Sequence, residues 1–179
     1  MTEKSVPAPA GGRIEVSEEI PELAILPSLW NELCAHAVET LPEECCGLIG
    51  GVEEEKFRSV YRCRNDMTSR HKNDPEEFPR DGATAFYMNE SDYLASMDIA
   101  DKDGELITAV YHSHVGVGAY FSELDQVFAS QQLFPLPEAH HFVISVLEDR
   151  VHEIASFNWQ GEAFVGRRLT SAGALKTHA

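Results

Sequence analysis

Two histidines at strand spacing are the residues of this sequence whose types and spacing most directly indicate chemistry. His112 and His114 follow an apolar run and are separated by one residue. If that run is extended, both side chains project from one face of a strand, with their Cα atoms roughly 6.6 Å apart. Two imidazoles at this separation can converge on one cation, at about 2.0 Å each for zinc. The pair alone is weak evidence, because histidines at this spacing often bind no metal.

Asp125 strengthens the case for a metal site. It lies eleven residues after His114, one turn into a predicted helix from which its carboxylate could return toward the histidines. Two neutral imidazoles and one carboxylate leave the fourth tetrahedral position of a zinc ion to water, as in catalytic zinc sites. The same letters have a second interpretation, in which Ser122 is a helix N-cap and Asp125 the acidic residue at the third helical position. That interpretation leaves the histidines unexplained.

A metal-bound water needs a proton acceptor, and two adjacent carboxylates precede a short apolar run. Glu43 and Glu44 lie at the entrance of a predicted strand at 46–51, so one of them could reach the metal and act as general base. The alternative is that both are ordinary acidic residues following a helix.

The apolar pattern predicts the elements that must position these side chains. A helix runs from Pro27 to the residues before Pro42, with Ser28 as its N-cap. The other predicted elements are strands at 46–51 and 57–63, a long surface loop at 64–82, a strand at 84–88, a helix from Ser91 to 104, a strand at 106–112, a helix at 122–133 stopped by Pro135, and strands at 142–147, 151–159 and 163–169. This order predicts an α/β fold of the α+β-like kind, a mixed curved β-sheet flanked by helices.

The chain is expected to form one domain between two flexible ends. Residues 1–24 are rich in Pro, Ala, Gly and Glu and predict a flexible lead-in, in which 13–16 could add a short edge strand. Residues 25–170 form the predicted catalytic domain, and 171–179 a flexible tail. Because the N-terminus lacks a hydrophobic signal core, a cytoplasmic location is expected.

Composition and charge argue against several classes of protein. Of 179 residues, 43% are hydrophobic, which is enough for one packed core and argues against a disordered chain. No apolar run approaches the roughly 18 residues of a membrane-spanning helix, so no membrane partner is expected. Thirty acidic against fourteen basic residues give a net charge of −16 without a basic cluster, which argues against nucleic acid as a partner.

The cysteines and the other histidines are expected to be mostly structural. The four cysteines, Cys34, Cys45, Cys46 and Cys63, form no C-x-x-C pair, which argues against a thioredoxin-like motif or a zinc ribbon and favours buried free thiols. His36 belongs to a helix core, whereas His140 and His141 open a strand and are weaker candidates for a supporting or substrate-binding role. A small basic patch in the predicted 64–82 loop could grip a substrate or be solvated charge; it consists of Arg70, His71, Lys72 and Arg80.

Three segments taken together resemble a known metalloprotease family. They are PEECCGLIGG at 42–51, YHSHV at 111–115 and SELD at 122–125. In this order and spacing they resemble the JAMM family (MPN+ or Mov34/PAD-1), in a compact form similar to its stand-alone prokaryotic members. The resemblance covers roughly residues 25–168 and implies an MPN/cytidine-deaminase-like architecture.

The resemblance also implies a role for each matched residue. His112, His114 and Asp125 would hold one zinc ion per chain, with a bound water. Glu44 would be the general base, and Ser122 would donate a hydrogen bond to the tetrahedral oxygen. The implied activity is a zinc-dependent peptidase or isopeptidase that cleaves at the C-terminal tail of a small ubiquitin-like or sulfur-carrier protein.

Two departures and two rival functions qualify the resemblance. The family usually has proline where this chain has Val115, and often where it has Phe121, so the loop between them is expected to be less stiff and its substrate preference altered. A catalytically silent MPN scaffold is the main alternative, although such scaffolds typically lack one or more of the Glu, His-x-His and Asp positions present here. A zinc deaminase of nucleosides would need H-x-E and a later P-C-x-x-C, and the sequence has neither.

Overall fold

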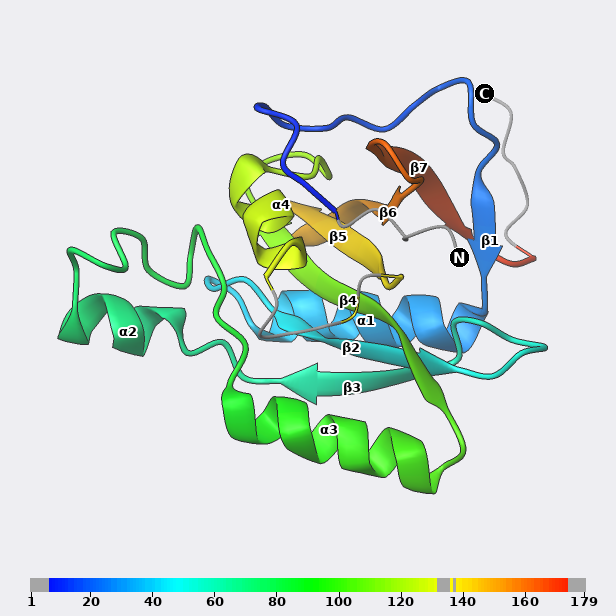
Figure 1. Cartoon of the computed structure of the whole chain (residues 1–179), viewed down its shortest axis with the longest axis horizontal. Helices are drawn as coiled ribbons and strands as arrows, with labels where there is room; N and C mark the ends of the chain where they lie inside the picture. The colour runs from blue at the N-terminus through cyan, green and yellow to red at the C-terminus, as the bar shows by residue number, and fades with distance from the viewer. Residues whose placement is uncertain (1–6, 132–135, 137, 174–179) are drawn as a thin grey trace.

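The structure is a computed structural model in which residues 7–131, 136 and 138–173 are described. Within them the elements are β1 (Leu23–Ile25), α1 (Pro27–Glu39), β2 (Cys46–Gly51), β3 (Ser59–Cys63), α2 (Met67–Asn73), α3 (Glu90–Lys102), β4 (Leu106–Val115), α4 (Glu123–Ala129), β5 (His140–Leu147), β6 (Arg150–Trp159) and β7 (Phe164–Ser171). The strands form one mixed sheet in the order β1-β7-β6-β5-β4-β2-β3, with helices on both sides (Figure 1). The predicted α/β class is therefore confirmed.

Different helices pack against the two faces of the sheet. On one face α1 packs through Leu29 and Leu33 against a core that includes Tyr111 of β4. On the other face lies a second core that includes Val110, with residues of α3 and α4 packed against it. Because successive strand residues point to opposite faces, His112 lies on the α3 and α4 side while its neighbour Tyr111 faces α1.

Gly47 leaves room for the ring of Tyr111, its partner on the neighbouring strand β4. A side chain at Gly47 would lie 2.4 Å from the Tyr61 carbonyl oxygen and 2.6 Å from the Tyr111 ring, so only glycine fits there. The buried Tyr111 hydroxyl forms a hydrogen bond of 2.7 Å with Nδ1 of His36 on α1. This contact fixes β4 against α1 one residue before His112, and it gives His36 the structural place expected for it.

Two predicted helix N-caps are wrong by two residues each. α1 begins at Pro27 with Leu26 as its N-cap, because the proline ring presets the helical φ and its missing N–H needs no cap. Ser28 is therefore inside the first turn. α3 begins at Glu90, because the side chain of Asn89 accepts a hydrogen bond from the Asp92 N–H at 3.0 Å and takes the capping place predicted for Ser91.

The segment 64–88 differs most from prediction. The predicted 64–82 loop contains the helix α2, and the predicted strand at 84–88 is an irregular segment with a single bridge between Asn65 and Met88. The Asn65 side chain supplies the hydrogen bonds that a neighbouring strand would give: its Nδ2 donates to the Ala85 carbonyl at 3.1 Å, and its Oδ1 accepts from the Tyr87 N–H at 3.0 Å.

The segment predicted as a lead-in contacts the sheet and the α4 region. Leu23–Ile25 is the edge strand β1, parallel to β7, while Ile14 and Val16 form isolated bridges instead of the predicted short strand. α4 ends at Ala129, four residues before its predicted end, and there the hydroxyl of its C-cap Ser130 donates to the Gln126 carbonyl at 2.7 Å. Pro135 and most of the predicted tail lie outside the described residues, and the domain boundaries stay a prediction. All four cysteines are free thiols. In the described part of the chain, no helix has the length and apolar character needed to cross a membrane.

Candidate metal centre

β4 carries both histidines to the same buried place. The strand extends to Val115, three residues beyond its predicted end, so His112 and His114 belong to the sheet and not to the following loop. Their side chains are 3% and 7% exposed, and their Nε2 atoms lie 3.2 Å apart. Two imidazole nitrogens thus face one point, as the two-residue period of a strand predicts.

α4 brings Asp125 to the same point. Its Oδ1 lies 3.1 Å from Nε2 of His112, and its Oδ2 lies 3.4 Å from Nε2 of His114. The ligand atoms of the three buried side chains all fall within 4.8 Å of one another, so the group could hold a metal ion. Two nitrogen ligands and one carboxylate are a donor set that suits zinc.

The capping interpretation of the SELD segment is also correct. The Ser122 hydroxyl accepts a hydrogen bond from the Asp125 N–H at 3.1 Å, and Oδ2 of Asp125 accepts one from the Ser122 N–H at 2.9 Å. This reciprocal pair is a capping box. The two interpretations of these letters are compatible, because the cap holds the Asp125 carboxylate in the orientation that faces the histidines.

Hydrogen bonding and charge give the three side chains the protonation states that cation binding requires. Nδ1 of His114 lies 3.0 Å from the Gly118 carbonyl. A carbonyl only accepts, so Nδ1 carries the hydrogen and the Nε2 lone pair faces the cluster. Burial alone would raise the pKa of Asp125, but His112 and His114 beside it hold that pKa well below its usual range. The ionised carboxylate and the imidazole nitrogens therefore fit a divalent cation.

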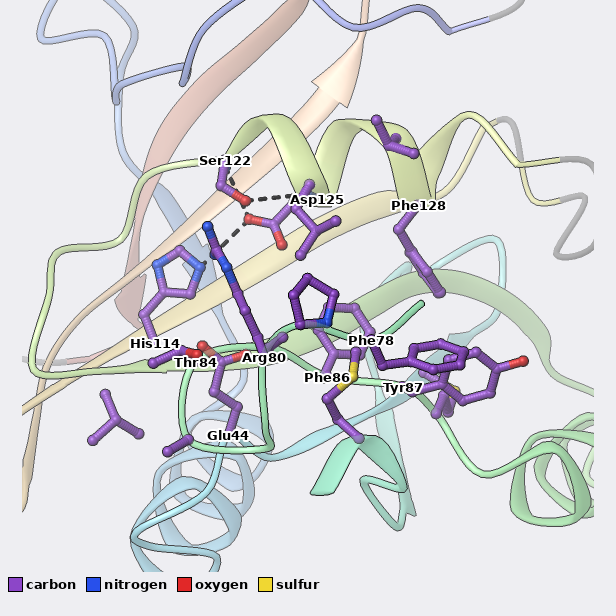
Figure 2. A pocket seen from close by; sticks show the side chains of 18 of the residues that line it. Glu44, Phe78, Arg80, Thr84, Phe86, Tyr87, His114, Ser122, Asp125 and Phe128 are labelled. Carbon is purple, nitrogen blue, oxygen red and sulfur yellow. Dashed lines mark hydrogen bonds and ion pairs between the residues drawn. The ribbon is translucent and has the colours of Figure 1, made fainter. Parts of the chain in front are cut away.

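The pairing of β2 with β4 brings Glu44 to the pocket beside the cluster. The Cys45 N–H donates to the Ser113 hydroxyl at 2.7 Å, and the Ser113 N–H donates to the Cys45 carbonyl at 3.0 Å. Glu44, one residue earlier, is buried and lines the same pocket as His114 and Asp125 (Figure 2). The pKa of Glu44 is raised to about 9, mainly by burial and also by the charge of Asp125, while the charge of Arg80 acts in the opposite direction.

Glu43, the other candidate base, lies apart from this pocket. Its carboxylate accepts a hydrogen bond from the Thr68 hydroxyl, and it is absent from the pocket lining. The structure therefore separates two glutamates that the local sequence could not distinguish.

A pocket of about 780 Å³ opens beside the cluster. One wall comes from α4 and the end of β4, and the other from residues 77–88. At one end lie Glu44, Arg80, His114, Ser122 and Asp125, and Figure 2 shows the aromatic side chains of Phe78, Phe86, Tyr87 and Phe128 toward the other end. The predicted base, the predicted oxyanion donor and two of the three candidate ligands thus border one space, with His112 beneath them.

The structure also shows where the two weaker histidine candidates lie, and it reveals an aromatic neighbour of His112. His140 bonds Ser156 at 2.9 Å and His141 packs on Phe121, and neither histidine lines the pocket. Sequence reasoning missed Phe86, whose ring stacks on His112 with centroids 4.5 Å apart. An aromatic residue in an irregular segment carries no local signal for this role.

The predicted basic patch does not act as one surface. Arg70 lies 3.4 Å from a Glu90 carboxylate oxygen, and Nδ1 of His71 lies 2.7 Å from the Phe78 carbonyl. Of the four patch residues, Arg80 alone lines the pocket beside the cluster.

Comparisons with known proteins identify a matching family and two kinds of relative, curated proteins and solved structures. Residues 26–160 match the family described as prokaryotic homologs of the JAB domain. Proteins named CysO-cysteine peptidase from Mycobacterium bovis and Mycobacterium tuberculosis are 27% identical over 135 residues, which are 75% of this chain and 81% of each relative.

Solved structures show the same fold. A protein from Desulfitobacterium hafniense aligns with a TM-score of 0.61 and 20% identity, over 87% of this chain and 97% of its own. One from Salinibacter ruber aligns with a TM-score of 0.56 and 19% identity, over 85% and 93%.

Proposed function

We propose that this chain, which belongs to the prokaryotic JAB-domain family, is a zinc-dependent peptidase that hydrolyses a peptide or isopeptide bond at the C-terminal tail of a small ubiquitin-like or sulfur-carrier protein. The observation that carries the proposal is the buried His112, His114 and Asp125 group at the edge of a pocket that also contains a glutamate and a serine. The relatives named CysO-cysteine peptidase support the choice of reaction and substrate class.

Three side chains would hold the metal in this proposal. His112 and His114 would bind through Nε2, and Asp125 through its carboxylate. A bound zinc ion supplies Lewis acidity that polarises the scissile carbonyl and acidifies a water. The Gly118 carbonyl and the capping box would keep two of these ligands in orientation, because His114 and Asp125 each use a second atom for those bonds.

Glu44 would move the proton that hydrolysis requires. A cation bound beside Glu44 would favour its ionised form, and the carboxylate would then accept a proton from the attacking water and return it to the leaving nitrogen. The backbone of Glu44 is held from both sides: its N–H donates to the Gly82 carbonyl at 2.7 Å, and its carbonyl accepts from Asn65 Nδ2 at 3.0 Å. A base held in this way does not need to be ordered when the substrate binds.

Ser122 would stabilise the oxygen that becomes negative in the tetrahedral intermediate. Its hydroxyl oxygen accepts the Asp125 N–H, which leaves the hydroxyl hydrogen free to donate into the pocket. A hydrogen bond at that oxygen strengthens as charge develops there and lowers the barrier.

A combined metal and cleavage measurement tests the proposal. The substrate is a ubiquitin-like sulfur carrier extended at its C-terminus, the products are followed by intact mass, and zinc is measured by mass spectrometry of the purified protein. We expect about one zinc per chain and a shortened carrier from the wild type, and neither from His112→Ala. Glu44→Gln should keep its zinc and lose activity by about 10²–10⁴-fold, the usual contribution of a general base.

Glu43→Gln is the matched control, since it makes the same change one residue away and outside the pocket. It should keep both zinc and activity. Equal zinc in the wild type and His112→Ala would contradict the assignment of the ligands, and full activity of Glu44→Gln would contradict the assignment of the base. Binding of the carrier without cleavage by the zinc-loaded wild type would instead favour the silent scaffold.

A further inference from the structure

Arg80 differs from most other arginines of this chain. Arg62 lies 2.7 Å from a carboxylate oxygen of Glu39, and Arg64 lies 2.9 Å from one of Asp92. Arg80 has no such bond within the part of the chain that the structure describes, although this chain carries more than two acidic residues for each basic one. The charge of Arg80 acts on the nearby Glu44 carboxyl, but no described carboxylate lies within ion-pair distance, so its guanidinium is available for an anion brought by a ligand.

An anion bound by Arg80 would lie in the pocket beside the candidate metal ligands. Among the described residues that line the main pocket, Arg80 is the only lysine or arginine. Figure 2 shows its side chain extended from the 77–88 wall toward Ser122 and Asp125, across the space above Glu44. An anionic group bound there would lie beside the groups proposed to cleave the substrate.

The backbone around Arg80 is held before any ligand binds. Two residues earlier, the Phe78 carbonyl is bonded to His71. Two residues later, the Gly82 N–H donates to the Thr68 hydroxyl at 3.0 Å, and a side chain at Gly82 would lie only 2.8 Å from that oxygen. The arginine therefore extends from a fixed segment, which reduces the entropy lost when it binds an anion.

The chemistry of a peptide tail narrows the identity of the anion. Arginine pairs with a carboxylate through two parallel hydrogen bonds. The peptide backbone near a scissile bond has a carboxylate only where the chain ends shortly after that bond. We infer that Arg80 binds the free α-carboxylate of the substrate tail, so that the enzyme releases a short C-terminal segment in preference to cutting within a longer chain. This inference rests on the proposed peptidase function and specifies the substrate class of the same pocket.

Paired peptides test the role of Arg80. They share one sequence, a carrier tail extended by a single residue, and end either in the free acid or in the amide. We expect the wild type to cleave the acid roughly 10- to 100-fold more efficiently than the amide, which is the usual effect of a hydrogen-bonded charge pair. Arg80→Ala should lose this preference by slowing cleavage of the acid alone, and Arg80→Lys should keep part of it, because an ammonium lacks the two-pronged geometry.

Lys72→Ala is the matched control, since it removes one positive charge from an exposed position of α2 outside the pocket. It should leave the preference unchanged. A wild type that cleaves acid and amide equally, or an Arg80→Ala variant that keeps the preference, would overturn the inference.

A binding measurement separates this inference from the proposed activity. Fluorescence anisotropy compares the two labelled peptides on Glu44→Gln and on Glu44→Gln with Arg80→Ala, where no turnover is needed. Tighter binding of the acid that disappears with Arg80 supports the inference even if neither peptide is cleaved, an outcome that would count against the peptidase alone. Equal binding of acid and amide to both variants overturns it.

Discussion

The two walls of the pocket are held in place by different means. The wall of β4 and α4 uses regular backbone structure: β4 pairs along its length with β2 and β5, and a capping box starts α4. The wall of residues 77–88 contains no helix or ladder, and side chains from outside it, chiefly Asn65 and Thr68, bind its backbone. The candidate metal ligands lie on the first wall, and the proposed carboxylate anchor lies on the second.

This difference matches the tolerances that the two tasks require. A metal site needs its ligands placed to within a few tenths of an ångström, which sheets and helices achieve better than loops do. A wall that selects the substrate can change more readily if it lies on an irregular segment tied at a few points. We therefore expect changes in the first wall to reduce the rate of the chemical step, and changes in the second to alter substrate binding.

Of the three variants that test this difference between the walls, Ser122→Ala is expected to have the largest effect on turnover. It removes the proposed oxyanion donor, which should lower kcat by about 10²–10³-fold. It also removes the N-cap of α4, which should lower the free energy of unfolding by about 1 kcal/mol. Steady-state kinetics and urea unfolding would measure the two effects separately.

Ser130→Ala makes the same substitution at the other end of α4. Its hydroxyl donates to the Gln126 carbonyl at 2.7 Å and does not line the pocket, so stability should fall slightly and kcat should not. If Ser122→Ala slows turnover no more than Ser130→Ala does, the Ser122 hydroxyl is a helix cap only.

Asn65→Ala tests the second wall and should have an intermediate effect. It removes the side-chain bonds to the backbone of Glu44, Ala85 and Tyr87. Because these bonds hold the wall that carries Arg80, we expect KM for the extended carrier to rise about tenfold, equal to a loss of roughly 1.4 kcal/mol in binding. Zinc content should stay at the wild-type value, because no metal ligand lies on this wall.

Two further variants complete this test, one at the same position and one at a distant asparagine that serves as the control. Asn65→Asp keeps the acceptor for the Tyr87 N–H but places a carboxylate oxygen against the Glu44 and Ala85 carbonyls, so its KM should be at least as high as that of Asn65→Ala. Asn73→Ala, at the exposed end of α2, should leave KM unchanged. If Asn65→Ala instead lowers zinc content and leaves KM unchanged, the second wall supports the metal ligands and not substrate binding, contrary to our proposal.

The same division explains how much of the site the sequence could predict. His112, His114 and Asp125 were brought together as predicted, because a two-residue strand period and a helix cap are patterns of local sequence. Their roles, and those of Glu44 and Ser122, stay predictions. The choice between Glu43 and Glu44 could not be made locally, because it depends on the pairing of β2 with β4, which are far apart in the chain.

The second wall could not be predicted for a related reason. Residues 84–88 have the apolar content of a strand, but Phe86 stacks on His112 and Met88 joins a core beside β2, so tertiary contacts account for that content without a ladder. Hydrogen bonds from one asparagine side chain to residues some twenty positions away leave no periodic signature. The fold class could be predicted from the order of the elements, whereas the conformation of this wall depends on single side chains and could not.

Gln126→Ala tests whether the N-terminal segment belongs to the first wall, and it should have the smallest effect on turnover. Gln126 is fully buried on α4; its Nε2 donates to the Gly12 carbonyl and its Oε1 accepts from the Ala10 N–H, both at 2.7 Å. Nε2 also donates to the buried Phe121 carbonyl at 3.3 Å, so losing this side chain should lower the free energy of unfolding by about 1–3 kcal/mol. Since Asp125 precedes Gln126, zinc affinity should weaken slightly while kcat at saturating zinc stays near the wild-type value.

Gln160→Ala, at an exposed position after β6, is the control and should change neither quantity. Removing residues 1–12 from the wild type breaks the two contacts with Ala10 and Gly12 but keeps the Nε2 bond to the Phe121 carbonyl, so its effect should be smaller than that of Gln126→Ala. If the truncated chain keeps wild-type stability and zinc affinity, the N-terminal segment is the independent lead-in that its composition predicts. If the truncated chain loses stability and zinc affinity, as Gln126→Ala should, the N-terminal segment is part of the first wall. One amide side chain, that of Gln126, then holds this irregular segment, as Asn65 holds the second wall.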